Sequence, residues 1–428
     1  MHFMSIKIKV NSLLKNKSFS DIGTYSFYSI IEKAIPFFIL PIYTRLFSVE
    51  ETGYYVLFIA IFSIVLPLSK LGLDGLAVVN YFKLGNKEFK EYLTLSSILY
   101  ILWFVVFLSI CLILSSFIGN ILKIDANIII FIVLTVFPYY FIALRLNIYR
   151  ASKQALNYSK LIILLSFLKH GISLILILFV EANWEYIVLA YGVSHLIISV
   201  LSIISLIKDK YFSLSLKFKG WKIIIKEGYP LALNQMNIWF GSSYSRVAIA
   251  DNMSIASAGG FGIASTFQAV MSLIQESFDK AYVPKLFEVL NKNDHKLNSK
   301  IVKYSYYYYF ILLLCGVAIS IIGYYGLDIV YGDKFTEFKI YVPFLVMASV
   351  FNGFYKIHVA YIFYEKKMIY ITLVTFLSSL TNVLLIYLLI GSLGLLGVVF
   401  ALICSQIVAY IVAFYFGNKF YKMPWLKK

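Results

Sequence analysis

Apolar runs of about 20 residues recur along the whole chain, and they constrain its fold more than any other feature. That is the length at which an α-helix crosses the hydrocarbon core of a bilayer while satisfying its own backbone hydrogen bonds. Apolar residues make up 61% of the chain and charged residues 14%, against roughly 45–50% and 25% in soluble domains. The sequence therefore predicts an all-α integral membrane protein with about twelve transmembrane helices.

The segments predicted to cross the membrane are separated by short polar connections. They lie at about 22–44, 53–79, 93–117, 127–147, 158–180, 185–207, 228–249, 258–282, 304–326, 340–363, 368–390 and 394–416. The first apolar run follows four lysines, is long, and has no convincing cleavage site, so we interpret it as an uncleaved signal anchor.

Lysine and arginine residues alternate in number from one connection to the next. With the N-terminus in the cytoplasm, 29 of the 38 basic residues fall in cytoplasmic segments and 5 in external ones. Short basic loops stay cytoplasmic, so we expect a multi-pass protein with both termini in the cytoplasm. The net charge of +17 suits anionic membrane lipids as partners. It does not indicate nucleic-acid binding, since no basic segment stands apart from an apolar one.

Several classes of membrane protein are disfavoured by what the connections hold. By our boundaries no loop exceeds about 24 residues, which is too short for a soluble nucleotide-binding domain. The chain has no GxxxxGK[ST], HExxH or GxSxG sequence, and its three cysteines lack the spacing of a metal or redox site. We therefore expect no catalytic residue, no metal and no cofactor. Glu50 and Glu51 are better explained as a helix start after Ser48 than as the acids of a membrane glycosyltransferase.

A short repeat indicates two halves. Tyr43-Thr44-Arg45 ends the first predicted helix, and Tyr244-Ser245-Arg246 ends the seventh. With six helices in each half, this favours two parallel six-helix bundles, at 1–210 and 211–428, around a central cleft, a repeat scheme that transporters use.

Charged residues inside the apolar segments are the candidate functional residues, because a charge at mid-bilayer costs about 2.5–3.5 kcal/mol and calls for a partner or a function. Lys70 and Asp74 have the i,i+4 spacing of a pair on one helix. Glu32 and Lys33 are adjacent and point about 100° apart, so they do not pair with each other.

Two further lysines, Lys169 and Lys356, have no acid in reach along their own helices. A cross-helix pair with Glu32, or a lysine reaching toward the headgroups, remains an alternative to a substrate contact.

The candidate cation site extends to the outer ends of the two halves. Arg45 and Arg246 occupy matched positions there, and the planar guanidinium suits pyrophosphate oxygens, although it also anchors helices at lipid headgroups. The predicted substrate-binding residues are therefore Lys33, Arg45, Lys70, Lys169, Arg246 and Lys356. Glu32 and Asp74 are the predicted ion-coupling residues, and Pro36 and Pro41 would let the helix of Glu32 bend.

Several segments resemble polysaccharide repeat-unit flippases of the Wzx type, within the multidrug/oligosaccharidyl-lipid/polysaccharide exporter superfamily. They are Pro41–Phe47, Glu50–Tyr55, Lys70–Gly75, Gly228–Leu231, Arg246, Gly259–Gly262, Phe278–Pro284 and Gly391–Gly397. The resemblance implies that the chain flips an undecaprenyl-pyrophosphate-linked oligosaccharide, such as an O-antigen repeat unit, to the outer leaflet of the bacterial cytoplasmic (inner) membrane. It also implies a polysaccharide polymerase and other assembly proteins as partners.

Two alternatives remain from the sequence. A drug or organic-cation exporter of the same superfamily would want surplus acid in the membrane, whereas this chain has surplus base. A membrane glycan polymerase or transferase would be expected to have a large external loop, and by our boundaries the chain has none.

Overall fold

The computed structural model describes residues 31, 35–213, 220–292 and 294–425. Within these ranges the regular elements are helices, and no strand occurs. A short apolar helix, Ile35–Leu46, comes first. The elements that follow are α3 (Val49–Lys70), α4 (Leu73–Lys83), α5 (Asn86–Leu122), α6 (Ala126–Val136), α7 (Tyr139–Ala151), α8 (Ala155–Phe179), α9 (Glu185–Lys208), α10 (Trp221–Ser242), α11 (Tyr244–Asn252), α12 (Ile255–Ala264), α13 (Thr266–Lys292), α14 (His295–Tyr331), the 3-10 segment η1 (Asp333–Tyr341), α15 (Val342–Tyr364), α16 (Met368–Leu393) and α17 (Leu395–Phe420).

Ten helical stretches within the described residues are long and apolar enough to cross a membrane. They match ten of the twelve predicted segments, which confirms a multi-pass all-α membrane protein. The first predicted segment lies partly outside the described residues. The seventh corresponds to α10 and α11 and is not among the ten stretches. Near its start, α10 carries the charged residues Lys222, Lys226 and Glu227.

Two helices are longer than the sequence predicted. Both α5 and α14 have 37 residues, about 55 Å at 1.5 Å per residue, well beyond the hydrocarbon core. Each begins with a polar turn that the apolar pattern did not include, capped at α14 by the Asp294 carboxylate accepting from the Lys296 amide at 2.8 Å.

The segment predicted as one helix over 53–79 is broken, so that prediction was wrong. Leu71 and Gly72 adopt left-handed conformations, with φ of 47° and 68°, and separate α3 from α4. The break lies against α10: a Cβ on Gly72 would be 2.6 Å from the Gly228 carbonyl oxygen, and one on Gly228 would be 2.5 Å from that of Leu71. Only residues without a side chain allow the two backbones to approach so closely.

The segment predicted as one helix over 127–147 is also broken, at Pro138, which has no N–H to donate. Two side chains bond carbonyls around this break. The Tyr100 hydroxyl donates to the Phe137 oxygen at 2.7 Å, and the His195 Nδ1 lies 2.8 Å from the Thr135 oxygen. His195 is thus hydrogen-bonded within the structure.

The continuous helices predicted over 228–249 and 258–282 are each divided in two as well. At the end of α10, Asn382 Nδ2 donates to the Phe240 oxygen at 2.9 Å, satisfying a carbonyl of the last turn. At Ser265, which separates α12 from α13, the side-chain hydroxyl donates to the Gly262 oxygen at 2.7 Å.

The chain divides into two compact units. Unit 1 comprises Met1–Leu46 and Ile61–Leu233, and unit 2 comprises Phe47–Ala60 and Asn234–Lys428. Both α3 and α10 therefore contribute to both units. The predicted boundary at residue 210 and the central cleft stay predictions.

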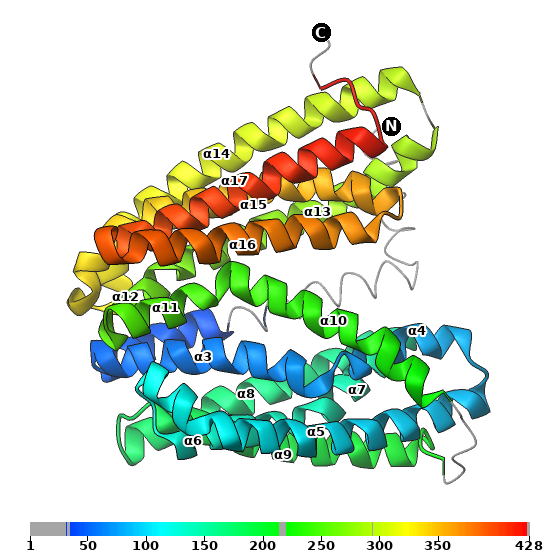
Figure 1. The fold of residues 1–428 in the computed structure, drawn as a ribbon, viewed down its shortest axis with the longest axis vertical. Helices are drawn as coiled ribbons and strands as arrows, with labels where there is room; N and C mark the ends of the chain where they lie inside the picture. The colour runs from blue at the N-terminus through cyan, green and yellow to red at the C-terminus, as the bar shows by residue number, and fades with distance from the viewer. Residues whose placement is uncertain (1–30, 32–34, 214–219, 293, 426–428) are drawn as a thin grey trace, which may run out of the picture. The chain divides into compact units, whose positions relative to one another are not determined.

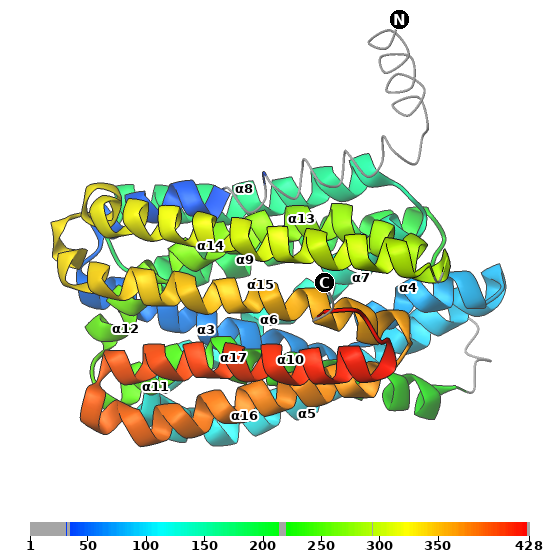
Figure 2. The same cartoon turned by 90° about the horizontal axis from the view of Figure 1, so that it is seen from above.

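Each unit has its own helix packing. In unit 1, α9 packs against α6, α7 and α8, around a core of Ile142, Leu146, Leu165 and Ile198. In unit 2, α15, α16 and α17 run side by side (Figure 1), and α14 runs along α13 and α15 (Figure 2). The N-terminal part of α3 meets α12 in unit 2, where a Cβ on Gly259 would lie 2.7 Å from the Gly53 nitrogen. Small residues let membrane helices approach in this way.

Candidate functional sites

The first candidate site is a row of cations and aromatic rings inside unit 1. Lys70 Nζ lies 2.7 Å from Asp74 Oδ2 and 5.5 Å from the centre of the Tyr139 ring. The sequence predicted that the two residues lie on one helix. In the structure they lie on different helices, on either side of the break between α3 and α4. Both side chains are 12% exposed, so the lysine is held between a carboxylate and an aromatic face.

The row continues through rings of α7 and α9 to Lys169 on α8. The Tyr139 and His195 rings meet edge to face with centroids 5.1 Å apart, and His195 meets Tyr191 at 5.8 Å. Lys169 Nζ lies 4.7 Å from the centre of the Tyr191 ring. Two of the predicted lysines thus belong to one continuous cluster, in which cation–π contacts stabilise both ammonium groups.

The helix Ile35–Leu46 adds a buried tyrosine to the same unit. The Tyr43 hydroxyl hydrogen-bonds Ser173 and lies 3.4 Å from His170 Nδ1. Arg45 follows two residues later and is exposed. Glu32 and Lys33 lie outside the described residues, so their predicted roles stay predictions.

The second candidate site is a polar cavity of about 220 Å³ inside unit 2. Helices α10 to α13, α15 and α17 line it, and Arg246 is the one charged residue among the described residues that line it. Its other polar side chains are Ser242, Ser265, Gln268, Ser272, Ser349, Asn352 and Gln406. A guanidinium nitrogen of Arg246 donates to the Ser265 hydroxyl at 3.4 Å, and no described carboxylate forms an ion pair with this arginine.

An ion pair lies beyond the cavity along two of its helices. Lys356 follows Asn352 by one turn of α15, and its Nζ lies 3.5 Å from Asp279 Oδ2 on α13. The prediction that Lys356 has no acidic partner along its own helix agrees with the structure. The sequence did not predict its partner Asp279 on another helix. A cross-helix acid cannot be identified from spacing on one helix.

Three residues of the cavity were also not predicted from the sequence, although their polar side chains in apolar segments could have identified them. Gln268, Asn352 and Gln406 are carboxamides inside otherwise apolar segments. Such groups are costly to bury without a hydrogen bond. A survey restricted to charged residues passes over them.

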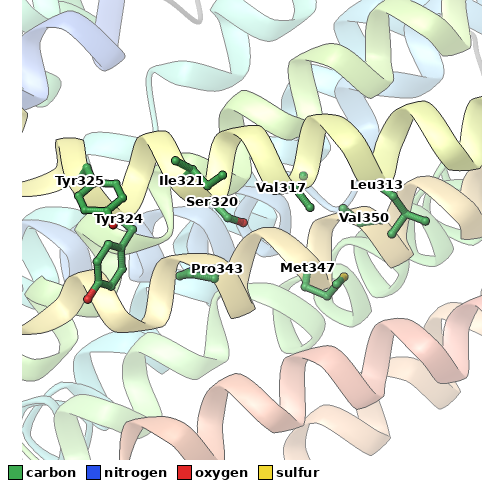
Figure 3. Close-up of a pocket in the computed structure, with 10 residues that line it drawn as sticks. Leu313, Val317, Ser320, Ile321, Tyr324, Tyr325, Pro343, Met347 and Val350 are labelled. Atoms are coloured by element: carbon green, nitrogen blue, oxygen red, sulfur yellow. The ribbon is translucent and has the colours of Figure 1, made fainter.

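An apolar groove of about 430 Å³ lies between α14 and α15 (Figure 3). Leu313, Val317 and Ile321 line it from α14, and Pro343 and Met347 from α15. The groove has no charged lining residue, so it offers no counter-charge for a phosphate. The cavity around Arg246 is therefore the better candidate for a polar ligand.

The fold is that of membrane transporters. The chain is similar to the inward-facing conformation of a multidrug resistance MATE family transporter, with a TM-score of 0.71 and 15% identity over 90% of this chain and 94% of that one. It is also similar to the lipid II flippase MurJ in an inward closed conformation, with a TM-score of 0.75 and 14% identity over 91% of this chain and 86% of that one. At such identities the likeness shows the fold alone.

The family follows from the sequence. The model of a family described as "Polysaccharide biosynthesis protein" matches residues 19–290, more than half of the chain, and the chain belongs to this family. A Haemophilus influenzae relative, described as an uncharacterized membrane protein, is 25% identical over 398 residues, which cover 91% of each chain. The family match agrees with the predicted part in polysaccharide biosynthesis, and the transporter structures agree with the predicted fold.

Proposed function

We propose that this protein is a flippase that moves undecaprenyl-pyrophosphate-linked oligosaccharide repeat units from the cytoplasmic to the outer leaflet of the bacterial cytoplasmic membrane. It acts by ion-coupled alternating access and makes or breaks no covalent bond. The family match and the transporter fold support the general class. The residues of the candidate sites support the chemistry of the cargo.

The observation that carries the proposal is the environment of Arg246. It donates a hydrogen bond to the Ser265 hydroxyl, and it lines a cavity whose other polar groups are neutral. Removing a cation from water without a counter-charge is costly, and a passing pyrophosphate would supply the counter-charge through the charge-assisted hydrogen bonds that arginine forms well. In unit 1, Lys169 over the Tyr191 ring is a further predicted substrate-binding residue.

An exporter of organic cations is the less favoured alternative. A cationic cargo would be repelled by Arg246, and no described carboxylate neutralises that residue. The MATE likeness concerns the fold, which different cargoes share. Within the proposal, ion coupling through Glu32 and Asp74 stays a prediction.

A flipping assay with Arg246→Ala tests the proposal. Purified protein is placed in proteoliposomes with fluorescent undecaprenyl-pyrophosphate-linked repeat unit in one leaflet, and the rate of its appearance in the other is measured. We expect the variant to lose about tenfold or more, the factor that a charge-assisted hydrogen bond contributes.

The matched control is Arg150→Ala. Arg150 is exposed at the end of α7 and donates to the Tyr158 hydroxyl at 3.2 Å, away from both candidate sites. It should flip at the wild-type rate. Undiminished flipping by Arg246→Ala, or efflux of ethidium without flipping by the wild type, would contradict the proposal.

A further inference from the structure

The cavity of unit 2 contains more hydrogen-bonding capacity than the protein uses. Asn352 Nδ2 donates to Gln406 Oε1 at 2.9 Å, joining α15 to α17, and Gln268 Nε2 donates to the Leu345 oxygen at 2.9 Å. Among the described residues, Asn352 Oδ1, Gln406 Nε2 and Gln268 Oε1 have no hydrogen-bond partner. The cavity therefore presents both acceptors and a donor.

The side chains of Gln268, Asn352 and Gln406 form a carboxamide wall of the cavity, and their chemistry favours one class of ligand. A carboxamide offers a carbonyl acceptor and an amide donor on one planar group, which matches hydroxyls that donate and accept at once. The wall carries no charge, so it gives an anion no particular advantage over a neutral polar group. Polyhydroxylated or acetamido-substituted rings fit such a surface, and the Phe261 side chain adds an apolar element to the lining.

The size of the cavity limits how much of a glycan can enter. Its volume of about 220 Å³ is below the roughly 300–1,000 Å³ of drug-sized ligand pockets. It therefore suits a part of the glycan of about one sugar ring. The ion pair of Lys356 and Asp279 lies one turn further along α15, and its net charge is zero.

We infer that the carboxamide wall of Gln268, Asn352 and Gln406 is a saccharide subsite, which binds one neutral sugar residue of the cargo while Arg246 holds an anionic group. The inference rests on the proposed function, because it assigns a part of the same cargo to the same cavity. It separates two tasks, since the arginine recognises charge and the carboxamides recognise the glycan.

The test compares two cargoes in the same proteoliposome assay. One is bare undecaprenyl pyrophosphate and the other is undecaprenyl pyrophosphate carrying the repeat unit. Asn352→Leu and Gln406→Leu keep similar side-chain volumes but lose the carboxamide. Each should slow flipping of the glycosylated lipid about tenfold, the factor of one hydrogen bond of ordinary net strength, and change that of the bare lipid less than about twofold.

Two further variants keep the test decisive. Asn252→Leu removes an exposed carboxamide at the end of α11 that bonds its own helix at Ala248, and it should not alter the ratio between cargoes. The exchange Asn352→Gln with Gln406→Asn keeps both carboxamides and should restore much of the glycan preference if a leucine variant folds poorly.

The outcomes distinguish the inference from the proposed function. Equal slowing of both cargoes by the leucine variants, or no slowing at all, would overturn the saccharide subsite while flipping itself stands. Failure of the wild type to flip either lipid would overturn the proposed function and the subsite with it.

Discussion

At the scale of single residues, buried cations in this protein have identifiable neighbours. Lys70 pairs with Asp74, Lys356 pairs with Asp279, and Lys169 lies over the Tyr191 ring. Arg246 contacts a serine beside a polar cavity. The sequence identified these charges as costly, and the tertiary structure decided that Lys70 and Lys356 pair with carboxylates while Arg246 contacts a hydroxyl.

Lys169→Ala should abolish surface polysaccharide without removing the protein from the membrane. The substitution removes the charge held over Tyr191 and leaves the ring in place. Complementation of a deletion strain measures surface polysaccharide, and immunoblotting of membranes measures the protein. Lys160→Ala on the exposed start of the same helix is the control. Normal export by Lys169→Ala would remove this lysine from the cationic site.

The Asp279 to Lys356 pair should matter for stability. Asp279→Asn leaves Lys356 without its carboxylate, and because both side chains are 26% exposed, we expect a loss of about 1–3 kcal/mol in the free energy of unfolding, below the cost of a fully buried pair. Thermal melting in detergent measures the loss.

Two variants complete this measurement. Adding Lys356→Met to Asp279→Asn should recover most of the stability, because no charge is then left unpaired. Glu288→Gln breaks an exposed pair with Lys292 on α13 and should change little. A drop for Glu288→Gln as large as for Asp279→Asn would contradict the interpretation.

At the scale of elements, one break in the described helices lies where two backbones meet and another lies at a proline. Gly72 and Gly228 bring α10 against the break between α3 and α4, and Pro138 separates α6 from α7. Carbonyls around the breaks of α7 and α10 are bonded by side chains of other helices, among them Tyr100 and Asn382. The interruptions are therefore maintained by packing as well as by local conformation.

Gly228→Ala should destabilise the protein. Its Cβ would lie 2.5 Å from the Leu71 carbonyl oxygen, so the backbones must separate, at a cost of about 1–3 kcal/mol. Gly171→Ala on α8 is the matched control, because no atom of the described residues outside its own stretch of helix backbone lies within 4 Å of its added Cβ. It should be neutral or stabilise by up to about 1 kcal/mol, the helix propensity gained. Equal melting temperatures for the two variants would show that the close contact has no energetic weight.

At the scale of the whole molecule, the topology still depends on charge counting. The ten candidate spans are defined by length and apolar character, and the alternation of basic residues orients them. Together they predict that the polar starts of α5 and α14 lie in the cytoplasm.

Reporter fusions test this orientation. Fusions after Lys90, Lys153 and Lys296 should report a cytoplasmic location, and fusions after Lys123 and Lys339 an external one. The physical reason is that short lysine-rich connections are retained on the cytoplasmic side during insertion. One external signal from the first group would remove the predicted arrangement with both termini inside.

The sequence by itself determined the class of fold, the positions of ten spans and the charges that need explanation, because hydropathy and formal charge are properties of a segment read alone. The break at Gly72, the partner of Lys356, and the gathering of Gln268, Asn352 and Gln406 around Arg246 were decided by tertiary structure. Each of them depends on atoms from helices far apart in the chain, and no period or composition within one helix records which other helix it will meet.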